Sequence, residues 1–363
     1  MKYYVISGEQ SGDMHAANLV AAIKQQDTQT EFRVWGGDKI KAEDVQLVKH
    51  IKDLAFMGFW EVLINLPTIL RNINFCKKDI LKFQPDALIL VDYPGFNFRI
   101  AKFAKQRGIK VYYYISPQIW AWKKSRLNQI KKYIDKMFVI LPFEKQFYQD
   151  NNFEVVFVGH PLLDEIAKDN FSFSIKTDKK IIALLPGSRK QEIRKILPQM
   201  LKIVADFPNY QFVVAATTTI EESFYKNILE NKNVLLVKDE TYGLLKNTKV
   251  ALVASGTATL ETALFAVPQI VCYKTNSISF QIAKRLVETK FISLVNIIMN
   301  KLVVKELIQS ELNPKNLKSS LSEILEKGSS ERIKKEYSVL REKLGDTGAS
   351  EQLAQLIVED IVK

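Results

Sequence analysis

The chain has 363 residues, a length typical of two domains rather than one. Hydrophobic residues make up 47% and charged residues 25%, which argues against disorder, and only two cysteines, Cys76 and Cys272, argue against a disulfide framework. Lysine and arginine (52) outnumber aspartate and glutamate (40), so the net charge of +12 favours an anionic partner: a nucleic acid, a diphosphate or a membrane surface.

Short β-branched or aromatic runs alternate with helical patterns of ten or more residues along most of the chain. Runs that are apolar at every position are typical of parallel strands covered on both faces, and the alternation predicts an α/β fold. Because the runs form two series, we expect two Rossmann-like domains. The first series comprises 3–7, 32–35, 87–91, 110–115 and 137–140, and the second comprises 180–184, 211–215, 234–237, 250–254 and 269–273.

The first run leads into the loop Ser7-Gly8-Glu9-Gln10-Ser11-Gly12-Asp13. Its two glycines allow a ligand to approach the backbone, and the following helix offers unpaired N–H groups. Glu9, Ser11 and Asp13 are therefore candidate site residues, with His15 just beyond them. The alternative is a tight turn in which Asp13 is simply the helix N-cap.

A strongly apolar helical pattern over residues 59–76 follows, with Lys77 and Lys78 directly after it. Such a helix can touch lipid as well as the core, and we expect Pro67 to kink or divide it. The basic run after Trp122 could serve the same anionic surface. Ordinary core packing with solvated charges is the alternative for both segments.

Asp92 ends the buried run 87–91 and is followed by Tyr93-Pro94-Gly95. A carboxylate at the end of a buried strand is costly unless it is solvated or hydrogen-bonded, so Asp92 is a candidate general base. A second helix cap is the alternative.

Two loops of the second series have the composition of a nucleotide site. Gly187-Ser188-Arg189 combines backbone amides, a hydroxyl and a guanidinium at a helix start, which suits a diphosphate. In Ser255-Gly256-Thr257 the helix also begins, and Glu261 lies one turn further on, where its carboxylate can accept both hydroxyls of a ribose. The alternatives are a plain turn and a solvated glutamate.

Residues 250–273 carry one charge, Glu261, but Gly256 and Pro268 interrupt them, so we expect strand, turn, helix and strand rather than a membrane span. The amino terminus has no apolar run long enough for a secretory signal. With the low cysteine content, this predicts a cytoplasmic protein.

A polar stretch over 164–179 separates the two series, and from Asn313-Pro314 onward the chain is charged and helical. We therefore expect domains over 1–165 and 166–344.

The sequence offers no metal site. It lacks a D-x-D motif, and its three histidines, His15, His50 and His160, show no metal-binding spacing. We expect no metal and no cofactor. His15 and His160 are nevertheless candidate supports of the site, because both are predicted in loops at the ligand edge.

At these loops the sequence resembles the lipid-A-disaccharide synthase family, and the resemblance covers nearly the whole chain. The matching segments are Ser7–Gly8–Glu9, Ser11–Gly12–Asp13–Met14–His15, Ser116-Pro117-Gln118-Ile119-Trp120-Ala121-Trp122, Leu141-Pro142-Phe143-Glu144, Gly159-His160-Pro161, Leu185–Arg189, Ser255–Glu261, Ser293-Leu294-Val295-Asn296 and Lys305-Glu306-Leu307-Ile308-Gln309.

The resemblance implies a GT-B-like fold with a cleft between its two domains and a C-terminal helix, about 345–363, that returns to the first domain. It implies an inverting, metal-independent transfer from UDP-2,3-diacylglucosamine to 2,3-diacylglucosamine 1-phosphate (lipid X), which gives the β-1,6 disaccharide 1-phosphate and UDP. It also implies peripheral attachment to the inner face of the inner membrane and, in some members, a homodimer.

By the same resemblance, Asn296, Glu306 and Gln309 line the donor pocket, and either Asp92 or Glu9 is the base. Many members have a second acid where this chain has Gly95, which favours Asp92. A UDP-sugar 2-epimerase shares the two-domain architecture and is the alternative function. A nucleic-acid-binding protein is disfavoured because no basic motif interleaved with aromatic residues is present.

Overall fold

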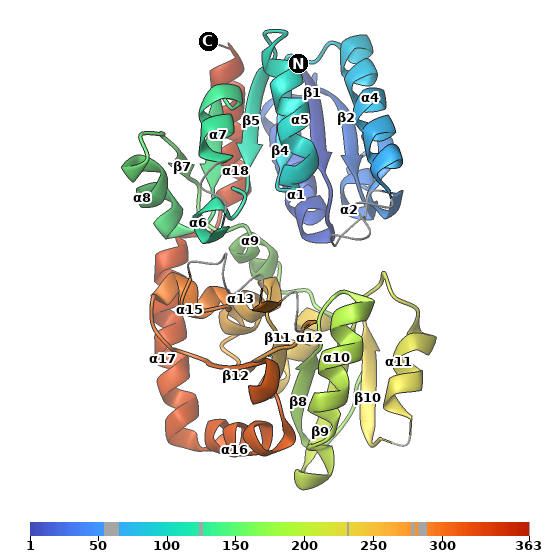
Figure 1. Cartoon of the computed structure of the whole chain (residues 1–363), viewed down its shortest axis with the longest axis vertical. Coiled ribbons are helices and arrows are strands. Elements are labelled where there is room, and N and C mark those ends of the chain that lie inside the picture. The colour runs from blue at the N-terminus through green and yellow to red at the C-terminus, as the bar shows by residue number, and fades with distance from the viewer. Residues whose placement is uncertain (54–64, 123–125, 231, 277–279, 282–288, 363) are drawn as a thin grey trace. The chain divides into compact units, whose positions relative to one another are not determined.

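The computed structural model describes residues 1–53, 65–122, 126–230, 232–276, 280–281 and 289–362. They form two compact units: unit 1 is Met1–Asp164 with Leu344–Lys363, and unit 2 is Glu165–Lys343. Each unit has one parallel sheet (Figure 1).

Unit 1 contains sheet A, whose seven strands lie in the order β3-β2-β1-β4-β5-β6-β7. The strands are β1 (Lys2–Ser7), β2 (Glu31–Gly36), β3 (Gln46–His50), β4 (Ala87–Val91), β5 (Lys110–Tyr114), β6 (Lys136–Val139) and β7 (Val156–Phe157). The helices are α1 (Gln10–Gln26), α2 (Asp38–Lys41), α4 (Leu66–Phe83), α5 (Pro94–Lys105), α6 (Ile119–Trp122), α7 (Leu127–Tyr133), α8 (Pro142–Asp150), α9 (Leu162–Ala167, which crosses into unit 2) and α18 (Ala349–Val362).

Helices cover both faces of sheet A, which explains why its strands are apolar throughout. Helices α4, α5 and α7 lie next to one another on one face, and α1 and α18 lie together on the other (Figure 1). In β5, the consecutive side chains Tyr112, Tyr113 and Tyr114 are all fully buried. A strand buried on both faces shows no alternation of polar residues.

Helix α18 is fixed to unit 1 by polar contacts at both ends. At its start, Asp164 accepts hydrogen bonds from the backbone N–H of Gly348 (2.6 Å) and from Ser350. Near its end, Asp360 accepts a hydrogen bond from Tyr112 (2.6 Å) and pairs with Lys136 (2.5 Å). The C-terminal helix thereby becomes part of the first unit.

Unit 2 contains sheet B, with six strands in the order β10-β9-β8-β11-β12-β13. The strands are β8 (Lys180–Leu185), β9 (Tyr210–Ala216), β10 (Val234–Lys238), β11 (Thr248–Ala254), β12 (Gln269–Tyr273) and β13 (Lys305–Ile308). The helices are α10 (Lys190–Leu201), α11 (Glu222–Leu229), α12 (Thr241–Lys246), α13 (Thr257–Leu264), α15 (Leu294–Met299), α16 (Pro314–Leu325) and α17 (Lys327–Leu344).

The predicted helix over 59–76 is described only in part, because residues 59–64 lie outside the described residues. Its later part is confirmed, since α4 begins at Leu66. Pro67 stands in the first turn of α4, where the missing N–H costs no helical hydrogen bond, so α4 itself is not kinked there. Ile73, Cys76 and Ile80 face the core.

Candidate functional site

Each sheet reverses its strand order at one point of its own, and most candidate residues of that unit lie in the loops at that point. In sheet A the strand order reverses between β1 and β4, and in sheet B it reverses between β8 and β11. Ligands of open parallel sheets bind beyond the carboxyl ends of the strands at such points. The loop of Glu9 and the loop of Asp92 follow β1 and β4, and the loops of Arg189 and Thr257 follow β8 and β11.

The backbone holds Asp92 in an unusual conformation. Asp92 and Tyr93 both have positive φ values, +46° and +48°, which cost roughly 1–3 kcal/mol per residue outside glycine. Three contacts fix the turn: the N–H of Asp92 donates to the Tyr114 carbonyl (3.0 Å), and its carbonyl accepts from Asn97 Nδ2 (2.6 Å) and the Tyr113 hydroxyl (2.5 Å). The backbone that carries the carboxyl is therefore held by β5 and by α5.

Burial and charge give the Asp92 carboxyl the properties of a base. Burial, then the like charge of Glu9, raise the pKa of Asp92 to about 7. The two loops are in close contact, because a Cβ at Gly8 would lie 2.2 Å from the ring of Tyr93. Only glycine at position 8 lets that ring cover the opening loop.

The structure assigns Asp13 a packing role. Glu9, not Asp13, is the N-cap of α1. The buried Asp13 carboxylate instead accepts hydrogen bonds from the backbone N–H groups of Gly37 (2.5 Å), Lys39 (3.0 Å) and Ile40 (3.3 Å). It thus satisfies N–H groups at the start of α2, and the alternative that Asp13 is the N-cap of α1 is wrong. Ser11 is partly exposed in the first turn of α1.

His15 and His160 are also buried, and His15 lies within α1 rather than in the predicted loop. His160 Nδ1 accepts a hydrogen bond from the Leu162 N–H (3.3 Å), and the His160 N–H donates to the Leu344 carbonyl (3.1 Å). Burial, then the nearby His15, lower the pKa of His160 to about 3. A histidine that stays neutral at physiological pH and anchors the chain before α18 supports the fold.

In unit 2, the Gly187-Ser188-Arg189 loop is open to solvent at the start of α10. Gly187 has φ +111°, and a Cβ there would lie 2.6 Å from the Glu192 carboxylate, so the turn requires glycine. Ser188 is exposed, and Arg189 pairs with Glu192 at 3.2 Å while its side chain is 52% exposed. An ion pair this exposed contributes little to stability.

The neighbouring loop after β11 presents hydroxyl and carboxyl groups. The Ser255 hydroxyl donates to the Ile292 carbonyl (2.8 Å), and Gly256 and Thr257 are exposed at the start of α13. Burial raises the pKa of Glu261, whose carboxylate accepts a hydrogen bond from Tyr242 (3.0 Å). Glu261 is therefore not an ordinary solvated helix residue.

The buried Asn296 and the partly exposed Glu306 form a hydrogen-bonded pair beside these loops. All of the Asn296 side-chain contacts are internal: its amide donates to the Val304 carbonyl (2.9 Å) and to Glu306 (2.8 Å), and its oxygen accepts from the N–H groups of Val303 and Val304. The Glu306 carboxylate in turn accepts the N–H groups of residues 292 and 293. This pair shapes the loop that receives the Ser255 bond.

Gln309 follows β13, has φ +54°, and accepts the Thr275 N–H at 3.3 Å. Its Nε2 is buried, and within the described part of the chain it has no hydrogen-bond partner. A donor in this position can serve an oxygen of a bound molecule.

Comparison with known proteins decides the family. The family model of lipid-A-disaccharide synthetase matches residues 3–359. The chain belongs to the lipid-A-disaccharide synthetase family. A lipid-A-disaccharide synthase from Syntrophus aciditrophicus is 40% identical over 375 residues, which cover 99% of this chain and 97% of that protein. The chain is accordingly a glycosyltransferase of lipid A biosynthesis.

Solved structures of other enzymes show the same fold as this chain. A UDP-GlcNAc 2-epimerase from Neisseria meningitidis, solved with UDP-GlcNAc, has a TM-score of 0.70 and 14% identity, covering 99% of this chain and all of that one. The glycotransferase of kitacinnamycin has a TM-score of 0.69 and 12% identity, covering 99% of both chains. At such identities the likeness establishes the GT-B-like fold and does not extend to epimerase activity.

Glu144 is a buried residue to which the sequence patterns assign no role. Its carboxyl is buried in the first turn of α8, beside the loop after β5. Burial raises the pKa of Glu144 to about 7. The family segment that contains it could have pointed to it, but nothing in its spacing says that the carboxyl is buried.

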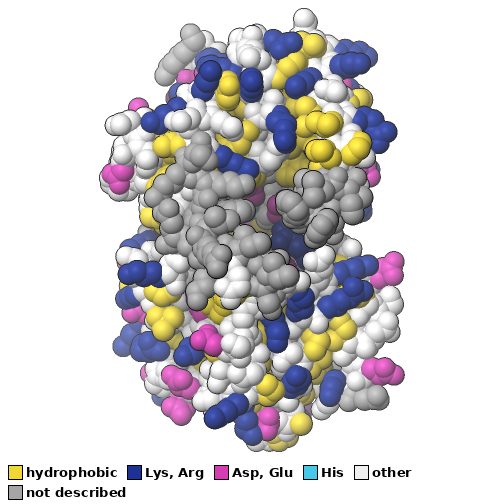
Figure 2. All heavy atoms as spheres, viewed as in Figure 1, with side chains coloured by type: hydrophobic (Ala, Val, Ile, Leu, Met, Phe, Trp, Pro, Cys, Tyr) yellow, Lys and Arg dark blue, Asp and Glu magenta, His cyan; other side chains and the backbone are white. Residues whose placement is uncertain are grey.

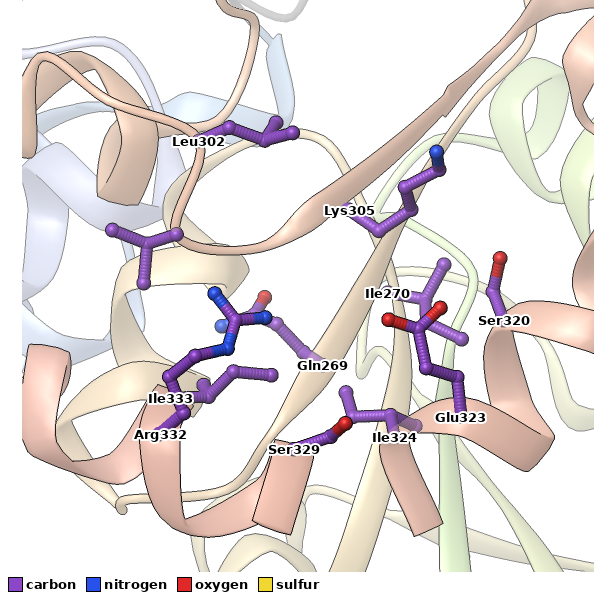
Figure 3. Close-up of a pocket in the computed structure, with 11 residues that line it drawn as sticks. Gln269, Ile270, Leu302, Lys305, Ser320, Glu323, Ile324, Ser329, Arg332 and Ile333 are labelled. Atoms are coloured by element: carbon purple, nitrogen blue, oxygen red, sulfur yellow. The ribbon is translucent and has the colours of Figure 1, made fainter. Parts of the chain in front are cut away.

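Metal ligands are not grouped in the described ranges, where no three His, Cys, Asp or Glu side chains come together. Helices in those ranges are likewise too short or too polar to cross a membrane. A cavity of about 210 Å³ lies between β12, β13, α16 and α17, and Lys305, Glu323 and Arg332 line it (Figure 3). Gln269 and Lys305, the first residues of β12 and β13, also line this cavity. It therefore lies at the amino ends of the strands of sheet B, opposite the edge that carries the site loops.

Proposed function

We propose that this chain transfers the sugar of UDP-2,3-diacylglucosamine to the primary hydroxyl of 2,3-diacylglucosamine 1-phosphate (lipid X). The products are the β-1,6-linked disaccharide 1-phosphate and UDP. The observation that carries the proposal is Asp92, whose strained and fixed turn holds a carboxyl of pKa about 7 at the switch point of sheet A, in a chain of this family.

In the proposed step, ionised Asp92 accepts the proton of the acceptor hydroxyl, and the oxygen attacks the anomeric carbon from the side opposite UDP. The bond to the β-phosphate oxygen breaks, and UDP leaves with the electron pair, so the anomeric centre inverts. A positioned base contributes roughly 10²–10⁴-fold. Glu9 is the second candidate for the base, and its like charge tunes Asp92 in either case.

Unit 2 supplies the donor site in this proposal. Gly187, Ser188 and Arg189 hold the diphosphate through amides, a hydroxyl and a guanidinium, which replaces a metal as counter-charge. Ser255, Gly256 and Thr257 border the same switch point. Glu261 binds the ribose, Gln309 offers its buried Nε2, and Asn296 with Glu306 shapes the wall.

Helix α4 supports peripheral attachment to an anionic membrane. Leu66, Leu70, Phe75 and Leu81 are 41–49% exposed, although each is large and apolar. Figure 2 shows hydrophobic and basic side chains side by side over the part of unit 1 where Figure 1 places α4. We propose that α4 rests on the inner face of the inner membrane. Lys123 and Lys124 of the predicted basic run lie outside the described residues, and a homodimer stays a prediction.

Mass spectrometry of the reaction products tests the activity. We expect the chain, mixed with both substrates and EDTA, to form disaccharide 1-phosphate and UDP. Failure to form the disaccharide with or without Mg²⁺ would sink the proposal. Incubation with UDP-N-acetylglucosamine alone is the companion measurement, and formation of its epimer would establish the alternative activity.

A further inference from the structure

The loop after β5 has no role in the mechanism so far, yet it is unusually constrained. Ile115, a β-branched residue, has φ +64°, which its side chain strongly disfavours. The next residue, Ser116, is buried and its hydroxyl contacts the Tyr148 hydroxyl at 2.6 Å. Strain of this kind persists only where surrounding contacts impose it.

Trp120 lies in α6, the short helix that follows this loop, and its side chain is partly exposed. Its indole Nε1 donates to Glu144 Oε1 at 3.1 Å. Its ring meets Phe143 edge-on, with centroids 4.8 Å apart and an interplanar angle of 90°. The indole is therefore fixed by one hydrogen bond and one ring contact, both from the start of α8.

Glu144 is a buried carboxyl, and its burial is unfavourable in free energy for a purely structural role. Its side chain is 1% exposed, and its other oxygen accepts the Leu141 N–H at 3.1 Å. Burying a carboxyl costs free energy that an apolar residue would avoid. The carboxyl nevertheless ties the cap of α8 to the Trp120 indole of α6.

The loop starts at the same edge of sheet A as the loop of the proposed base. Strand β5 is paired with β4 and with β6, so the loop that leads to Trp120 leaves the carboxyl edge of sheet A between the strands that precede Asp92 and α8. Adjacent strands are about 5 Å apart, so the loops after β4 and β5 begin within roughly the width of one sugar ring. The Tyr113 hydroxyl already links β5 to the Asp92 carbonyl.

We propose that Trp120 is a binding surface for the sugar ring of the acceptor and that Glu144 is the positioning residue that holds its indole in place. The inference rests on the proposed function and adds an acceptor subsite to it. An indole presents a flat apolar face to the C–H groups of a sugar ring, while the polar groups of the sugar stay free for other contacts. Because the indole is fixed before binding, less conformational entropy is lost when the acceptor arrives.

The test is steady-state kinetics with each substrate varied in turn. We expect Trp120→Ala to raise the acceptor KM about tenfold or more while the donor KM and UDP affinity stay within about twofold, since only acceptor binding is removed. Trp120→Phe and Glu144→Leu should each give a smaller rise. Glu144→Gln, which keeps an oxygen for the indole N–H, should restore most of the affinity.

Coupling between the two residues separates positioning from general stability. In the double variant Trp120→Ala/Glu144→Leu, the acceptor KM should match that of Trp120→Ala alone, because Glu144 acts through the indole. Glu154→Gln, an exposed carboxylate in the same unit, is the matched control and should change nothing. Thermal unfolding of each variant checks the fold.

An unchanged acceptor KM in Trp120→Ala overturns the inference, and so does an equal rise in both KM values. If Glu144→Leu does not fold, the Trp120 variants and Glu144→Gln still decide it. Absence of product from the wild-type chain would instead sink the proposed function, so the two failures are distinct.

Discussion

The carboxyl of Asp92 owes its chemistry to its neighbours. A solvent-exposed aspartate is almost fully ionised at neutral pH and is a weak base. Here burial and the charge of Glu9 bring the pKa to about 7, so the carboxyl can accept a proton under physiological conditions. The hydrogen bonds from Asn97 and Tyr113 to the Asp92 carbonyl keep the group in place.

We expect Asp92→Asn to lower kcat by roughly 10²–10⁴-fold, because the amide cannot accept the proton. UDP affinity, measured by calorimetry, should stay unchanged, because unit 2 carries the proposed nucleotide site. Glu9→Gln is the comparison variant. If Glu9→Gln lowers kcat by roughly 10²–10⁴-fold and Asp92→Asn does not, Glu9 is the base.

The pH dependence of kcat/KM follows from the same carboxyl. A base must be deprotonated, so the rate should rise with pH and level off above about pH 7, the raised pKa of Asp92. Glu9→Gln removes a like charge that raises this pKa, so the midpoint of the profile should move to lower pH. A midpoint that stays in place or moves upward in Glu9→Gln would contradict the coupling.

Helix α10 and its preceding loop form the proposed diphosphate site. The positive φ of Gly187 turns the chain into the helix, so the first N–H groups of α10 and the exposed Ser188 and Arg189 lie together in the proposed site. The position of the helix after β8 at the switch point is what suggests this role.

Arg189→Ala should weaken UDP binding by about tenfold or more, since a charge-assisted contact to phosphate is worth roughly 1.5–3 kcal/mol. Both UDP affinity and turnover should fall. Lys190→Ala, next in the chain and also exposed, is the control. Equal UDP affinity in Arg189→Ala and wild type would remove Arg189 from the site.

The apolar strands show what local pattern can and cannot predict. All ten predicted runs are strands in the structure, from β1 to β12, whereas β3, β7 and β13 were missed. Strand β7 has two residues, and β3 and β13 include polar side chains such as Lys49 and Glu306. Edge strands are covered less fully, so they need not be apolar throughout and lack the signal.

Net charge and exposed apolar surface together favour attachment to an anionic membrane. The chain carries a net charge of +12, and α4 adds four large exposed apolar residues near Arg71, Lys77, Lys78 and Lys82. Electrostatic attraction brings a basic protein to the surface, and apolar side chains then insert.

We expect the chain to bind anionic vesicles in a sedimentation assay and to be released in part by about 0.5 M salt, which screens charge. Leu70→Glu/Phe75→Glu should reduce binding at low salt, because the variant replaces inserted side chains with repelled carboxylates. Val339→Glu, on an exposed apolar residue of α17, is the control. Equal binding of the α4 variant and wild type would exclude this helix as the contact.

By itself, the sequence determined the α/β class, the two series of strands and the loops that carry Asp92, Arg189 and Glu261. Apolar runs and small residues before helices are local properties, and they can be read without knowing what lies nearby. The family motifs add the reaction class for the same reason.

Tertiary structure alone decided which polar residues are available for chemistry. Asp13 and Asp92 both follow strands of sheet A. The Asp13 carboxylate accepts three N–H groups around the start of α2, whereas burial and the charge of Glu9 raise the pKa of the Asp92 carboxyl. The link between Trp120 and Glu144 likewise joins residues 24 positions apart. Such assignments depend on burial and on partners remote in the chain, which no local pattern encodes.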